Sequence, residues 1–114
     1  MTDMRKDARY VIDTSIRAVL PDRAVQRALQ HYTRPKGRLV LVALGKAAWQ
    51  MAAAASECLG DAVSDGIVIT KYGHARGPIP GLRIREAGHP VPDQNSFDAT
   101  AEAIALVEPL TGED

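Results

Sequence analysis

Lys46 is the residue whose position in this sequence best fits a chemical role. It follows an apolar run over residues 39–44 and Gly45, and an alanine-rich helical pattern begins directly after it. Where a strand ends and a helix begins, an open α/β sheet has the edge at which ligands bind. The helix N-terminus there offers free N–H groups and a partial positive charge. The pattern predicts an anion pocket; the alternative is a lysine at a solvated turn.

Further polar residues follow the other two predicted strands. Lys71, Tyr72 and His74 come directly after the apolar run 66–70, and Glu86, His89, Asp93 and Ser96 lie at or after the end of a third strand. Parallel strands deliver such loops to one crevice. We therefore predict a phosphate- or substrate-binding site made of Gly45, Lys46, Lys71, His74, His89, Asp93 and Ser96, with Lys46 as the catalytic candidate.

Some of these residues also have a purely structural interpretation. Residues 88–93 form a Gly-His-Pro-Val-Pro-Asp turn, in which His89 and Asp93 could simply bond backbone groups. Lys71 could be a solvated lysine after a strand.

Three familiar site motifs are absent. The Gly-Lys pair is not a P-loop, because Val40 stands where that motif needs a glycine and Ala47 replaces the magnesium-binding Ser or Thr. The turn contains only Gly45, where a dinucleotide fingerprint needs three glycines. The three histidines are not at metal-ligand spacing, so we predict no metal site.

The elements that must position these residues follow from apolar periodicity. Helices are predicted over residues 3–20, 21–31, 48–59 and from a cap at Asn95 or Ser96 to about 107; strands are predicted over 39–44, 66–70 and 82–87. Strand, helix and strand in this order favour parallel pairing. The fold class is α/β: a Rossmann-like three-layer sandwich fragment, about three mainly parallel strands flanked by four helices.

Each of these helices has apolar residues at helical spacing on one side. In the first, Ala8, Val11, Ile12, Ser15, Ile16 and Val19 follow the helical period. In the last, the inward side is predicted to consist of Phe97, Ala101, Ile104, Ala105 and Val107.

Bulk composition narrows the function classes. The chain has 114 residues, with 14 basic and 14 acidic side chains, so its net charge gives no reason to expect nucleic acid as a partner. A single cysteine and a charged N-terminal stretch without an apolar run long enough to span a membrane predict a cytoplasmic protein without a membrane partner.

Three motifs together resemble one known family. They are Gly45-Lys46-Ala47-Ala48 with Met51-Ala52, the stretch 65–74 (DGIVITKYGH), and the stretch 86–93 (EAGHPVPD) with Ser96. In order and spacing, across residues 38–114, they are similar to the N-terminal segment of the DUF4147-type glycerate 2-kinase family, whose members carry a MOFRL C-terminal domain.

The resemblance implies a kinase, a transferase that phosphorylates D-glycerate at its 2-hydroxyl with ATP and Mg²⁺. It also implies that Lys46 acts on substrate or phosphate, and that residues 1–114 are the N-terminal part of a Rossmann-like domain whose remainder, with the C-terminal domain, is absent here. We therefore expect the chain alone to be inactive as a kinase.

Two other functions stay open. One is a non-catalytic α/β module that binds a small anion or a partner chain. The other is a hydroxypyruvate reductase, a label that some members of the family carry. A homo-oligomer, or association with the missing remainder of the enzyme, is the expected protein partnership.

Overall fold

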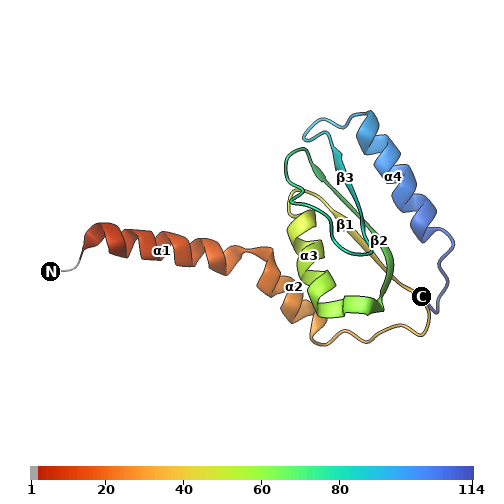
Figure 1. The fold of residues 1–114 in the computed structure, drawn as a ribbon, viewed down its shortest axis with the longest axis horizontal. Coiled ribbons are helices and arrows are strands. Elements are labelled where there is room, and N and C mark those ends of the chain that lie inside the picture. The colour runs from red at the N-terminus through yellow and green to blue at the C-terminus, as the bar shows by residue number, and fades with distance from the viewer. Residues whose placement is uncertain (1–2) are drawn as a thin grey trace.

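A three-stranded parallel sheet lies at the centre of the computed structural model, which describes residues 3–114 (Figure 1). Its strands are β1 (Leu39–Leu44), β2 (Val63–Lys71) and β3 (Arg83–Ala87). β2 is in the middle and pairs in parallel with both neighbours. All three strands therefore end at the same edge of the sheet, as predicted, although β2 begins at Val63 rather than at residue 66.

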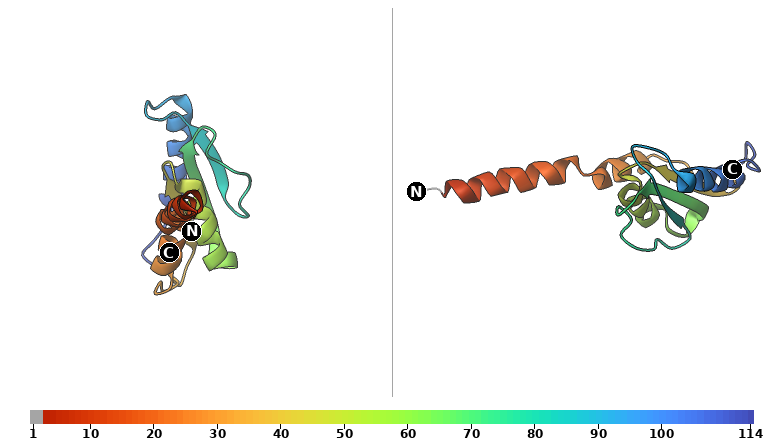
Figure 2. Two further views of the ribbon diagram at one scale, coloured as in Figure 1. Left: turned by 90° about the vertical axis from the view of Figure 1, so that its left-hand side faces the viewer. Right: turned by 90° about the horizontal axis from the view of Figure 1, so that it is seen from above.

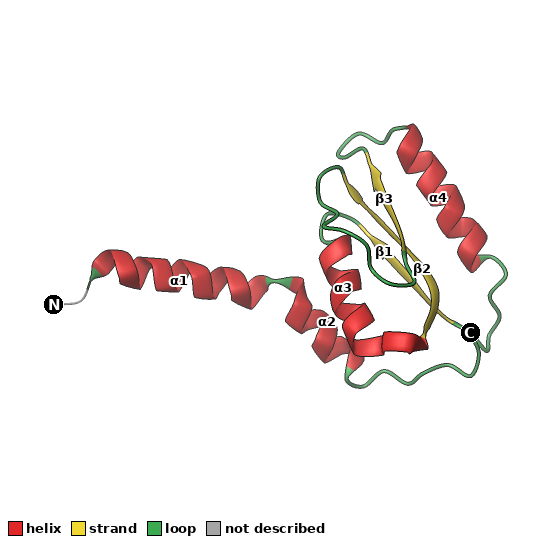
Figure 3. Ribbon diagram, in the orientation of Figure 1, coloured by secondary structure: helices red, strands yellow, loops and turns green. Residues whose placement is uncertain are grey.

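Helices cover the two faces of the sheet, which gives three layers (Figure 3). α3 (Ala48–Leu59), followed by the short 3₁₀ helix η1 (Gly60–Ala62), packs on β1 and β2, and α4 (Gln94–Val107) packs on β3 and β2. Side chains alternate along a strand. Accordingly, Ile84 joins the core beneath α3 while its neighbour Arg85 pairs with Glu102 of α4. The predicted α/β class is confirmed.

The main core lies between α3 and β2. Ala48 and Ala52 of α3 contact Val68 of β2, and all three are almost fully buried. Small alanine side chains let the helix approach the sheet closely. The fourth member of this cluster is Ile79, which is 6% exposed and belongs to the loop between β2 and β3. This loop therefore forms part of the core.

The predicted inward side of α4 was wrong. Ala99 is the buried residue of this helix, whereas Phe97 is 61% exposed and Ile104 is 55% exposed. The reason is that α4 carries apolar residues on two faces, and periodicity cannot choose between them. The buried Ala99 and the Arg85–Glu102 ion pair at 3.1 Å show which face of the helix lies toward the sheet.

The first helix projects away from the sheet. α1 (Met4–Val19) has no buried residue, and its apolar stripe, including Val11 and Ile16, is more than half exposed (Figure 2). α2 (Pro21–Leu29) instead packs on α3, where Gln50 Nε2 donates to Asp22 Oδ1 at 2.7 Å. No helix among the described residues has the length and apolar character that a membrane crossing needs.

Candidate functional site

Lys46 lies at the turn that joins β1 to α3. Gly45 makes this turn with a positive φ of 111°, a conformation that side chains with a Cβ disfavour. Its N–H donates to the Ile69 carbonyl at 3.0 Å, so the turn continues the pairing of β1 with β2. No side chain caps α3. The first turn of α3 therefore keeps N–H groups and its partial positive charge beside Lys46.

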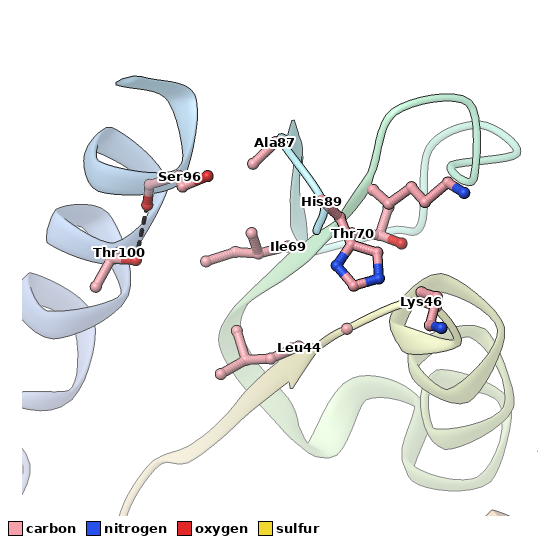
Figure 4. A pocket seen from close by; sticks show the side chains of 11 residues that line it. Leu44, Lys46, Ile69, Thr70, Ala87, His89, Ser96 and Thr100 are labelled. Carbon is pink, nitrogen blue, oxygen red and sulfur yellow. Dashed lines mark hydrogen bonds between the residues drawn. The ribbon is translucent and has the colours of Figure 1, made fainter. Parts of the chain in front are cut away.

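A cavity of about 390 Å³ opens at this edge of the sheet, between the strand ends and α4 (Figure 4). Its lining residues are Leu44, Gly45, Lys46, Ile69, Thr70, Lys71, Ala87, Gly88, His89, Ser96 and Thr100. Five of the seven predicted site residues are thus brought together: Gly45, Lys46, Lys71, His89 and Ser96. No Asp or Glu is among the lining residues.

His74 lies on the other side of Lys46, in a second hollow. This hollow of about 420 Å³ is lined by Lys46, Ala47, Trp49, Gln50, Gly73, His74 and Arg76. His74 Nδ1 lies 3.1 Å from the Lys46 carbonyl oxygen, so the histidine joins the loop after β2 to the β1–α3 turn. Arg76 brings a further cation that sequence reasoning missed, because a residue in a Gly/Pro-rich loop has no strand end to place it.

Asp93 does not line either hollow, because its carboxylate is already occupied by other groups of the protein. Oδ2 accepts from the Tyr72 hydroxyl at 2.5 Å, and Oδ1 accepts from the Gly88 and Ser96 N–H groups, each at 3.1 Å. These bonds, the Tyr72 bond above all, lower the pKa of Asp93 to about 2, and the same contact raises the pKa of Tyr72. Asp93 therefore fixes the ends of β2, β3 and α4 relative to one another.

The same residue also corrects the predicted helix cap. Asp93, not Asn95 or Ser96, is the N-cap of α4, and Ser96 completes a capping box by accepting from the Asp93 N–H at 3.0 Å. Asn95 instead donates to the Tyr72 hydroxyl at 2.8 Å. The turn needs Gly88, because a Cβ there would lie 2.5 Å from the Val91 carbonyl oxygen.

The cations at the edge have no ionic partner in the described part of the chain. The four ion pairs found among residues 3–114 use Arg9, Arg38, Arg83 and Arg85, none of which lines the cavity. Within the same residues, no group of three or more His, Cys, Asp and Glu side chains could hold a metal ion. The arrangement can therefore attract an oxyanion through Lys46, Lys71 and the start of α3.

Sequence reasoning also missed Thr70. This residue of β2 lines the cavity and is 3% exposed. A threonine in a β-branched run signals only strand propensity. Nothing in the sequence marks its hydroxyl as different from that of a structural threonine.

Comparison with known families gives a match over nearly the whole chain. Residues 7–114 match the family described as "Domain of unknown function (DUF4147)". The resemblance inferred from the three motifs is thereby confirmed.

Relatives with two different names are similar to nearly the whole chain. A D-glycerate 2-kinase of Thermotoga maritima is 48% identical over 97% of this chain and 26% of its own length. A proposed hydroxypyruvate reductase of Agrobacterium vitis is 40% identical over 96% of this chain and 24% of its own length. The chain spans about a quarter of the length of these relatives.

A solved structure shares the fold. The crystal structure of glycerate kinase from Thermotoga maritima superimposes with a TM-score of 0.84 at 46% identity, covering 97% of this chain and 26% of that one.

Proposed function

The chain belongs to the DUF4147 family, and we propose that it supplies the oxyanion-binding edge of a glycerate 2-kinase. The reaction is the ATP-dependent phosphorylation of D-glycerate at its 2-hydroxyl. The observation that carries the proposal is Lys46, without an ionic partner among the described residues, at the end of β1 and the start of α3, in a cavity with Lys71 and His89 and without a carboxylate. The relatives named glycerate 2-kinase support it.

The proposed roles follow from the chemistry of each group. Lys46 holds a carboxylate or phosphate oxygen as a point charge, assisted by the free N–H groups of α3. Lys71 adds positive charge and His89 offers a ring nitrogen for a hydrogen bond, whereas the Ser96 hydroxyl already donates to Asp93 Oδ1 at 3.1 Å and so contributes mainly to the shape of the cavity. Phosphoryl transfer depends mainly on positioning and on stabilising charge, which is what a fixed lysine at a helix N-terminus provides.

The lining residues fit a phosphate group but not a magnesium ion. Mg²⁺ prefers carboxylate and water oxygens, and the cavity lining contains no carboxylate. The Mg²⁺ that the resemblance implies therefore finds no carboxylate ligand among these residues. The phosphates of ATP, in contrast, match the cations at the edge.

We also propose that the 114-residue chain binds ligand without turning it over. Relatives are about four times longer, and the cavity offers cations and hydroxyls but no carboxylate to act as a base. ATP-dependent phosphorylation of D-glycerate by the purified chain, above the rate of a Lys46→Ala variant, would contradict this.

Binding of inorganic phosphate and of D-glycerate, measured by calorimetry at low salt, tests the site. Lys46→Ala should weaken binding about 10- to 100-fold, since a hydrogen bond to a charged group contributes about 1.5–3 kcal/mol. Lys36→Ala is the matched control, because Lys36 is exposed and precedes β1 at the opposite end of the strand. Equal affinities for the Lys46 and Lys36 variants would refute the proposal.

A hydroxypyruvate reductase is the second candidate, because the Agrobacterium vitis relative has that name. The β1–α3 turn opposes it, since Gly45 is its single glycine and a dinucleotide-binding turn uses three. We expect no hydroxypyruvate-dependent oxidation of NADH by the chain. A rate that Lys46→Ala abolishes would favour the reductase.

A further inference from the structure

Thr70 holds a buried hydroxyl at the edge of the sheet where Lys46 lies. It is the next-to-last residue of β2, the middle strand, and it lines the cavity between the Gly45–Lys46 turn and the Gly88–His89 turn. Its side chain alternates with that of Ile69 and so lies on the same face as Val68, above the start of α3. In Figure 4 the hydroxyl lies toward Lys46 and away from Ser96.

This hydroxyl has no hydrogen-bond partner among the described residues. Thr70 is 3% exposed, and its Oγ1 is buried and unbonded. The other buried oxygen without a hydrogen bond, Glu102 Oε2, lies 3.1 Å from Arg85 Nε and so has an ionic partner. Thr70 is therefore the one buried side chain in residues 3–114 with a polar atom and no polar partner.

An unbonded buried hydroxyl lowers stability relative to a valine of nearly the same shape, and buried polar groups in proteins are nearly always bonded. When such a hydroxyl lies in the wall of a cavity, a ligand that fills the cavity can supply the missing hydrogen-bond partner. Beside Lys46 and the uncapped start of α3, the group that fits is an acceptor with negative charge.

We propose that Thr70 is a binding residue of this site, whose hydroxyl donates a hydrogen bond to an oxygen of the carboxylate or phosphate that Lys46 holds. The proposal rests on the proposed function, because it names a further contact to the same oxyanion. Three kinds of donor then converge on the ligand: an ammonium group, helix N–H groups and a hydroxyl.

The test compares Thr70→Val, which replaces the hydroxyl by a methyl group of similar size, with Thr70→Ser, which keeps the hydroxyl and loses the methyl group. Calorimetric titration of the 114-residue chain with inorganic phosphate, and separately with D-glycerate, should show about 10-fold weaker binding for the valine variant. The serine variant should stay within about 3-fold of the parent. The ligand that responds identifies the oxygen as phosphate or carboxylate.

A second measurement separates a binding role from a structural one. Without ligand, Thr70→Val should unfold in urea at the same midpoint as the parent chain or a higher one, because nothing bonds the hydroxyl in the free protein. A lower midpoint would show that the hydroxyl has a partner in the free chain and would overturn the proposal. Unchanged ligand affinity in Thr70→Val would overturn it as well.

The two proposals fail in different ways. If the parent chain binds ligand and Lys46→Ala does not, while Thr70→Val binds normally, only the role of Thr70 is lost. If the parent chain binds neither phosphate nor D-glycerate, the anion site itself is wrong, and the role of Thr70 is refuted with it.

Discussion

Replacing Ile79 by alanine tests whether the loop between β2 and β3 belongs to the core. Ile79 is 6% exposed and contacts the cluster formed by Ala48, Ala52 and Val68. Truncating a buried isoleucine costs about 2–5 kcal/mol through lost burial and the cavity left behind. Domains of this size are stable by about 5–15 kcal/mol. We therefore expect the variant to lose a substantial part of the stability of the chain.

Trp49 provides the signal for this experiment. It is the one tryptophan in the sequence, packs against the same cluster, and donates from Nε1 to the Gly77 carbonyl of the loop at 2.9 Å. Urea unfolding followed by its fluorescence should show a midpoint lower by roughly 1 M or more, because a loss of about 2–5 kcal/mol is divided by typical urea dependences of about 1–3 kcal/mol per M.

The matched control is Ile104→Ala on α4, where the isoleucine is 55% exposed. Surface substitutions of this kind change stability by about 0.5 kcal/mol or less. If both variants shift the midpoint equally, or if Ile79→Ala shifts it by less than the control, the loop does not contribute to the core as described.

Two further predictions concern the turn at Asp93. Gly88→Ala should lower the unfolding free energy by about 1–3 kcal/mol, because its Cβ would lie 2.5 Å from a backbone oxygen, whereas Gly112→Ala, with open space around it, should be nearly neutral in the same urea titration. Asp93 has a pKa of about 2, below its ordinary value of 3.8, so its contribution to stability is complete above about pH 4 and is lost as the pH falls toward 2. The stability difference between the parent chain and Asp93→Asn should therefore shrink over that pH range; a constant difference would contradict the assignment. The stability of Asp93→Asn should itself still fall with pH in this range, because the pKa of Asp114 is also about 2.

The sequence predicts the centre of the fold well because local signals agree there. The apolar run of β1, the single glycine at Gly45 and the alanine-rich period of α3 each favour the same element boundary, and no tertiary contact is needed to choose among alternatives. Parallel pairing of β1 with β2 then follows from the intervening helix. This is why five of the seven predicted site residues line one cavity.

The features that the sequence did not predict correctly share a different cause, since each depends on contacts between segments distant in sequence. Ile79 is in a loop by composition and becomes a core residue only because α3 and β2 leave a space for it. The cap of α4 is Asp93 because Tyr72 and Gly88, from two strand ends, orient its carboxylate. The inward face of α4, where Ala99 is buried and Glu102 pairs with Arg85, depends on how the helix packs on β3 and β2. No pattern within one segment carries that information.

The arrangement of the carboxylates near the site explains why positive charge remains at the edge. Asp93 accepts from two hydroxyls and two N–H groups, and Glu86 accepts from the Ala75 N–H at 3.3 Å. Both acids are thus satisfied by uncharged donors and neither forms an ion pair within residues 3–114. Had either paired with Lys46 or Lys71, an incoming anion would first have to displace it. Because the acids hold the turns instead, the lysines keep their charge for a ligand, and the same hydrogen bonds that shape the cavity leave it ready to bind an oxyanion.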